Sequence, residues 1–164
     1  MTAETKETDV PVLEQTKEKK AEEKMVIASP LKGKTMKLSQ LQDEAFASGA
    51  LGQGLAILPE EGAVYAPADG TISAFFPTGH AIGLTTTAGV ELLIHVGMDT
   101  VQLEGKGFTP LAKAGDVVKK GEKLLEFDLE MIKEAGFSLA TPVLVANYGD
   151  YQNILSSDAK EVQP

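Results

Sequence analysis

Short apolar runs, separated by glycine, proline and other turn-forming residues, follow one another from Met25 onward. Runs of this kind at regular spacing are typical of strands in an antiparallel all-β sandwich or barrel. The pattern predicts only one clear helix, over residues 129–135 and ended by Gly136, with a further turn near residues 38–46. We therefore predict an all-β protein with one or two short helices, and strands at residues 26–28, 54–58, 63–66, 71–76, 81–85, 90–94, 123–127 and 142–146.

Residues 1–24 have a different character, because they are polar and of mixed charge. Only Val10, Val12 and Leu13 could anchor this stretch, and Pro11 interrupts them. Such a segment buries too little apolar surface to offset the entropy lost on ordering. We expect residues 1–24 to be a charged disordered tail or linker, with an exposed helix over residues 14–24 as the alternative, and a folded domain at 25–164.

Composition narrows the possible functions. The 164 residues carry a net charge of −9 and no cysteine. Disulfides, thiolate metal sites and cysteine nucleophiles are therefore excluded, and a nucleic-acid partner is not expected because it would demand clustered Lys and Arg. The sequence also has neither an apolar run near the roughly 20 residues of a membrane span nor the apolar core of a signal peptide. We expect a cytoplasmic protein.

The only two histidines, His80 and His95, flank a predicted hairpin whose turn is Thr86-Thr87-Ala88-Gly89. If Thr85 pairs with Val90 across this turn, residue 80 faces residue 95 on the neighbouring strand. Directly opposed residues of an antiparallel pair have Cβ atoms roughly 4.5–5.5 Å apart, so the two imidazoles should touch. A shift of one residue would place them on opposite faces.

Two touching imidazoles allow three interpretations. One ring can be a nucleophile that carries a covalent group while the other donates a hydrogen bond to that group. Both rings can bind a metal, with Asp99 or Glu91 as the third ligand. The third interpretation is a pair of half-buried histidines with no chemical role. The residues near the pair favour a nucleophile, because the Thr78 hydroxyl lies two positions before His80 and Gly97 permits close approach of a partner.

Several stretches closely resemble the glucose-type enzyme IIA family of the bacterial sugar phosphotransferase system (EIIA type 1). They are residues 66–72, 78–81, 89–101, 103–108, 121, 126–128 and 141–143, and the similarity extends over about residues 25–147. The resemblance implies a sandwich-like barrel of the duplicated hybrid motif type. It also identifies residues 25–164 as a phosphocarrier domain, which is a phosphotransferase component that needs no cofactor.

The resemblance further implies roles for individual residues. His95 would accept phosphate on Nε2 from the histidine-containing phosphocarrier protein and pass it to a cysteine of a IIB domain during sugar uptake. His80 would contact the phosphate and Thr78 would orient the His80 ring. Acidic residues at the rim of the site would be Asp43 and Asp99, and an apolar ring that docks partners would comprise Phe46, Leu51, Phe76 and Leu93.

Two departures and two alternatives accompany this resemblance. The tail is longer and more charged than the membrane-contacting segment of some family members, and is more similar to a linker joining the module to IIB and IIC domains or to a transporter at the inner face of the membrane. A zinc-binding or metal-dependent hydrolase is the first alternative, since His95 and Asp99 have a spacing suited to metal ligands. A biotin or lipoate carrier is the second, although residues 129–133 do not supply its usual modified lysine. The sequence does not specify a sugar.

Overall fold

The computed structural model describes residues 25–151, 153–157 and 159–164, so the predicted tail at 1–24 lies outside the described residues. The chain divides into two compact units. Residues 28–146 and the C-terminal residues 159–164 form the larger unit, which contains every strand and α-helix of the described residues. Residues 25–27, 147–151 and 153–157 belong to the smaller unit, in which the regular element of the described residues is the 3-10 helix η3 (Tyr148–Asp150).

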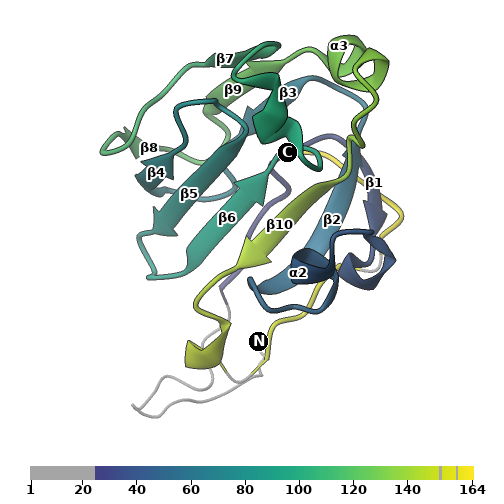
Figure 1. Cartoon of the computed structure of the whole chain (residues 1–164). Helices are drawn as coiled ribbons and strands as arrows, with labels where there is room; N and C mark the ends of the chain where they lie inside the picture. Colours follow the sequence, from purple (N-terminus) through teal and green to yellow (C-terminus); the bar gives the residue numbers. More distant parts are fainter. Residues whose placement is uncertain (1–24, 152, 158) are drawn as a thin grey trace. The chain divides into compact units, whose positions relative to one another are not determined.

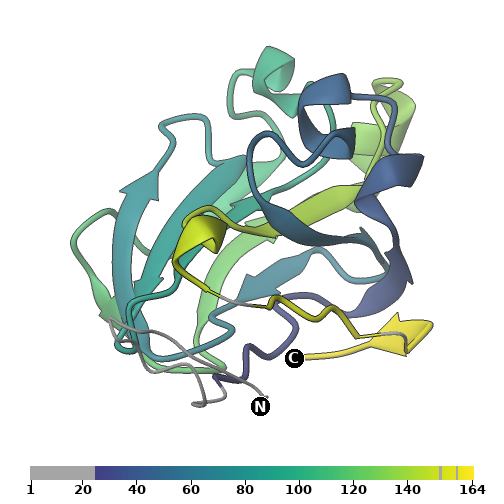
Figure 2. The same ribbon diagram turned by 90° about the horizontal axis from the view of Figure 1, so that it is seen from below.

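The larger unit is built from two antiparallel sheets (Figures 1 and 2). The larger sheet has the order β11-β1-β2-β10-β6-β5-β4-β8 and the smaller sheet the order β3-β9-β7. The predicted all-β antiparallel class is confirmed. The strands are β1 (Gly33–Met36), β2 (Gln53–Pro59), β3 (Ala63–Tyr65), β4 (Gly70–Phe75), β5 (Ala81–Thr86), β6 (Glu91–His95), β7 (Phe108–Pro110), β8 (Val117–Val118), β9 (Lys123–Phe127), β10 (Thr141–Val145) and β11 (Glu161–Val162).

Helices are few and short in the part of the chain that the structure describes. The α-helices are α2 (Glu44–Ala47) and α3 (Leu129–Glu134), and the larger unit also has the 3-10 helices η1 (Leu38–Gln40) and η2 (Thr100–Leu103). Each of these two α-helices is preceded by an N-cap aspartate, Asp43 or Asp128, whose side chain accepts a hydrogen bond from a backbone N–H of the first turn. Within the described residues, no helix combines the length and apolarity needed to cross a bilayer.

The strand predictions fail where a strand has little apolar alternation. The apolar run at 26–28 is not a strand. The chain instead forms β1 a few residues later, where Gly33 and Lys34 gave no hydrophobic signal. The strands β7, β8 and β11 were also not predicted, because two or three residues are too few to establish a period.

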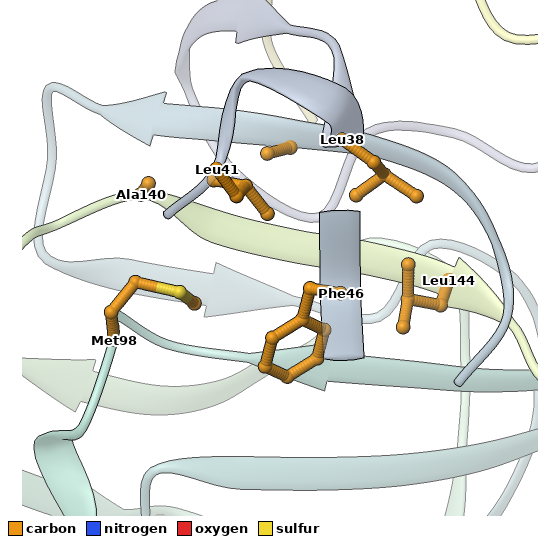
Figure 3. Close-up of a cluster of buried hydrophobic side chains, with 7 residues drawn as sticks. Leu38, Leu41, Phe46, Met98, Ala140 and Leu144 are labelled. Atoms are coloured by element: carbon orange, nitrogen blue, oxygen red, sulfur yellow. The ribbon is translucent and has the colours of Figure 1, made fainter. Parts of the chain in front are cut away.

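A cluster of buried apolar side chains joins the helical segment at 38–47 to the large sheet (Figure 3). The cluster brings Phe46 of α2 together with Ala56 of β2, Leu144 of β10 and Met98, which follows β6. Burial of one large apolar side chain contributes about 1.5–3 kcal/mol, which explains why so short a helix holds its position. The whole cluster is Leu38, Leu41, Phe46, Ala56, Met98, Ala140 and Leu144.

The hairpin of β5 and β6 has a register one residue away from the predicted one. Ala81, not His80, is the cross-strand partner of His95. The Thr86 N–H bonds to the Val90 carbonyl at 2.9 Å, so the connection has three residues, ending in Gly89 with φ +94°. A three-residue loop that ends in a left-handed glycine is a common hairpin turn, whereas the prediction assumed a loop of four.

Candidate functional site

The two histidine rings lie side by side despite the different register. Their ring centroids are 5.0 Å apart, and the rings meet edge to face at 76°. His95 is the last residue of β6, whereas His80 lies on a bend just before β5, after Gly79 with φ +81°. Because His80 is outside the regular strand, the alternation of faces does not fix its side-chain direction. The predicted contact therefore exists, but the bend produces it rather than direct cross-strand pairing.

The inner face of β6 follows the sequence pattern. Val90, Leu92 and Ile94 are buried, whereas Glu91 is exposed and His95 partly so. The backbone of His80 is hydrogen-bonded to the residue that follows His95, because the Val96 N–H donates to the His80 carbonyl at 2.7 Å. The end of the hairpin thus holds both imidazoles at one place.

His95 has one ring nitrogen engaged by the backbone. Its Nδ1 lies 2.8 Å from the Gly97 carbonyl oxygen. A carbonyl can only accept a hydrogen bond, so Nδ1 must carry the proton. In the neutral ring, Nε2 then has a free electron pair. Burial lowers the pKa of His95 below its ordinary 6.5. The hydrogen bond to Gly97 and the negative charges of Asp43 and Asp99 act to raise this pKa, but the effect of burial is larger. His95 is therefore largely neutral and nucleophilic at neutral pH.

The His80 ring is hydrogen-bonded to Thr78, the residue predicted to orient it. The Thr78 Oγ1 lies 2.6 Å from His80 Nδ1. Because a hydroxyl can donate or accept, this bond orients the ring without fixing its tautomer. The side chain is 3% exposed. Burial, reinforced by repulsion from a charge on His95, lowers the pKa of His80 to about 4. His80 is thus neutral at pH 7, with Nε2 able to donate when Thr78 donates to Nδ1.

The predicted rim carboxylates occupy different local structures. Asp43 caps α2, and its side chain accepts from the Ala45 N–H at 2.9 Å. Asp99 precedes η2 with φ +61°, in a left-handed conformation that is uncommon outside glycine, and makes no side-chain cap bond. Both act electrostatically on His95, so the structure brings these two carboxylates, far apart in sequence, to the same histidine.

The four predicted docking residues differ in exposure. Phe76 and Leu51 are each 45% exposed, and Leu93 is partly buried. The Phe76 ring lies 5.4 Å from the His80 ring, edge to face. Phe46, in contrast, is only 6% exposed, and its ring lies 5.1 Å from that of His95. Phe46 therefore forms a wall behind His95 and offers little surface to a partner in this conformation.

Two further residues near His95 were not identified from the sequence. Thr100 and Thr141 are fully buried, and their hydroxyls bond to the backbone of the segment that follows His95. Both threonines lie in stretches that resemble the enzyme IIA family, but the sequence does not reveal their hydrogen bonds. The bond of Thr141 joins segments 44 residues apart, and the bond of Thr100 to the Val96 carbonyl, four residues away, depends on the local backbone conformation.

The two alternatives find no support in the geometry. Among the described residues, no group of three or more His, Cys, Asp or Glu side chains could hold a metal ion. Lys133, the lysine considered for biotin or lipoate, lies within α3 and not at a hairpin tip.

Comparison with protein families gives one match over most of the chain. Residues 25–151 match the family described as "phosphoenolpyruvate-dependent sugar phosphotransferase system, EIIA 1".

Individual relatives agree with this match. The chain is 49% identical over 140 residues to a beta-glucoside-specific EIIBCA component of Halalkalibacterium halodurans, covering 85% of this chain and 22% of that protein. It is 40% identical over 146 residues to a glucose-specific EIIA component of Staphylococcus epidermidis, covering 89% and 88%. The solved structure of glucose permease IIA from Mycoplasma capricolum superposes with a TM-score of 0.77 at 34% identity, covering 85% and 90%. The chain spans about a fifth of the length of the beta-glucoside-specific relatives it matches.

Proposed function

Because the chain belongs to the EIIA 1 family of the phosphoenolpyruvate-dependent sugar phosphotransferase system, we propose that it is a phosphocarrier that relays a phosphoryl group during sugar uptake. The donor is the histidine-containing phosphocarrier protein, and the acceptor is a cysteine of a IIB domain. One observation carries the proposal. His95 keeps its proton on Nδ1, bonded to the Gly97 carbonyl, and leaves the Nε2 electron pair available.

The two transfer steps use that electron pair in turn. In the first step, His95 Nε2 attacks the phosphorus of the donor's phosphohistidine. The donor's N–P bond breaks, and its electron pair returns to the donor ring. In the second step, the thiolate of the IIB cysteine attacks the phosphorus on His95. The N–P bond breaks, and the electron pair returns to Nε2. The protein is regenerated, so a phosphotransferase component can act repeatedly without a cofactor.

His80 stabilises the phosphoryl group in this scheme. The pKa of His80 is lowered to about 4, so its ring is neutral at pH 7. A neutral ring does not repel a positive charge on His95. With the Thr78 hydroxyl donating to Nδ1, the His80 Nε2–H is free to donate to a phosphoryl oxygen. Two neighbouring histidines therefore have unequal roles, one as nucleophile and one as hydrogen-bond donor.

Partner docking is assigned to the apolar surface beside the histidines. Phe76 and Leu51 are large apolar side chains left substantially exposed, and Leu93 lies beside His95 on β6. A dry apolar collar excludes water while the phosphoryl group is shared, and a small interface still permits rapid release. Asp43 and Asp99 would add a negative rim that favours a basic donor surface.

The names of the relatives support a IIB domain as the acceptor. Several are named as EIIBCA or EIICBA components, and this chain matches only part of their length. The IIB partner of this chain is therefore either a separate protein or another part of one polypeptide. The proposed setting is the cytoplasm, at the inner face of the membrane whenever the chain acts with its permease. The sugars in the relatives' names differ, being beta-glucosides, glucose and glucosamine.

Labelling with phosphoenolpyruvate tests the proposal. Mixed with the general phosphotransferase proteins and radiolabelled phosphoenolpyruvate, the protein should gain one acid-labile, base-stable phosphate. His95→Ala should abolish the labelling. His80→Gln is the matched control at the second histidine, and should keep the labelling but block passage to a IIB domain. Labelling of the His95→Ala variant would show that the carrier has been assigned to the wrong residue.

A further inference from the structure

The peptide group that joins Val96 to Gly97 is held at both ends by side chains. The Val96 carbonyl accepts from the Thr100 hydroxyl. The Gly97 N–H donates to Thr141 Oγ1 at 3.4 Å. The Thr141 hydroxyl itself donates to the Leu139 carbonyl at 2.9 Å, so its proton is used and an electron pair is left for Gly97. Both threonines are fully buried. Their hydroxyls therefore fix this peptide without competition from water.

The next peptide group, from Gly97 to Met98, is fixed in the same way. The Met98 N–H donates to the Ser138 carbonyl at 3.0 Å, and the Gly97 carbonyl accepts from His95 Nδ1 at 2.8 Å. All four polar groups of two consecutive peptides are thus bonded within the protein. The carbonyl that His95 requires cannot turn away unless at least one of these bonds breaks.

From this geometry we propose that Thr100 and Thr141 are positioning residues, which hold the Gly97 carbonyl so that His95 keeps its proton on Nδ1 and its reactive electron pair on Nε2. The proposal rests on the proposed function, in which His95 is the phosphoryl carrier. A neutral imidazole can carry its proton on either nitrogen. If the carbonyl were free to move, part of the His95 population would hold the proton on Nε2, where it would block attack on phosphorus.

Burial of the two hydroxyls supports this role. A buried hydroxyl is unfavourable unless it is bonded, and a valine of the same shape could fill either position without that requirement. Thr141 also lies on β10, a different segment from the one it bonds. The two hydroxyls therefore have a role beyond packing. They bond the peptide group between Val96 and Gly97, which adjoins the Gly97 carbonyl that accepts from His95.

The test is the tautomer of His95 in the variant Thr141→Val, measured by nitrogen-15 NMR of the imidazole rings. With two histidines in the chain, the spectrum contains four ring nitrogens, and His80→Gln assigns them. The native protein should have Nδ1 of His95 protonated. Thr141→Val should move part of the population to the Nε2–H tautomer and slow phosphorylation by the donor about two- to tenfold, the ratio that one neutral hydrogen bond represents. Thr100→Val is a second variant with the same expected shift.

Two controls separate the hydroxyl from packing. Thr141→Ser keeps the hydroxyl and should behave as the native protein. Thr86→Val removes a similar bond, that of Thr86 Oγ1 with the Val90 N–H at 3.0 Å, at the other end of the hairpin, and should leave the His95 tautomer unchanged. An unchanged tautomer in both valine variants of the proposed pair would overturn the inference, as would an equal shift in either control.

The experiment also distinguishes the two proposals. The tautomer is measured in the unphosphorylated protein and does not depend on a donor. If the valine variants shifted the tautomer but the donor did not phosphorylate even the native protein, the proposed function would be refuted and the positioning role would stand.

Discussion

Replacing Gly97 by alanine would place a methyl group in a space that the fold has already filled. Gly97 has φ +75°, and a Cβ there would lie 2.6 Å from Thr100 Cγ2 and 2.8 Å from the Ser138 carbonyl oxygen. That oxygen accepts the Met98 N–H, so it cannot retreat without weakening a backbone bond. The left-handed backbone costs a non-glycine residue about 1–2 kcal/mol, and overpacking adds about 1–3 kcal/mol.

The expected loss for Gly97→Ala is therefore about 2–5 kcal/mol of unfolding free energy. Gly136→Ala is the matched control, because Gly136 has φ +88° but no atom within 4 Å of an added Cβ. It should lose only the backbone part, about 1–2 kcal/mol. Urea unfolding followed by far-ultraviolet circular dichroism measures both variants, since the chain contains no tryptophan. If the two variants lost the same free energy, the packing argument at Gly97 would be refuted.

Three further predictions concern the residues around the histidines. Burial lowers the pKa of His80 from 6.5 to about 4, so between these pH values the unfolded chain binds more protons than the folded protein. The urea midpoint should therefore fall as the pH drops from 6.5 to 4, and an equally steep fall in His80→Gln would contradict this. Thr78→Val removes the hydroxyl bonded to the His80 ring and should slow transfer to a IIB domain about tenfold while His95 is still phosphorylated; an unchanged transfer time course would argue against the orienting role. Phe76→Ser should raise the KM for the phosphorylated donor several-fold and change stability by less than about 1 kcal/mol, whereas Val117→Ser, 75% exposed in β8, should leave the KM unchanged; equal effects would point away from a docking surface.

The sequence was informative wherever hydrophobic alternation was strong. In β6 and the residue before it, Val90, Leu92 and Ile94 are buried as the pattern predicted. Alternation works there because one face of the strand must be removed from water. In β1 the pattern is weak, because Lys34 and its neighbours lie near the edge of the sheet, where backbone pairing rather than burial holds the strand. Its pairing with β2 and β11 depends on distant segments that local patterns do not specify.

The histidine site shows the same division. The contact of His80 with His95 could be predicted because the hairpin brings its ends together, but the register could not. Thr86-Thr87-Ala88-Gly89 is compatible with a loop of three or four residues, and the choice shifts every pair by one. The bonds between Thr86 and Val90 close the shorter loop. The bend that redirects His80 has no counterpart in hydrophobic pattern.

The ends of the large sheet bear on how such a carrier behaves at high concentration. Its order ends in β11 on one side and β8 on the other, and each has two residues. Long exposed edges recruit strands from other chains and promote aggregation. Strands this short present few unpaired backbone groups of their own, so the pairing of copies through β8 or β11 is disfavoured. Under the proposed function, encounters with the donor and the acceptor are made instead by side chains at the histidine end, where recognition can be brief and reversible.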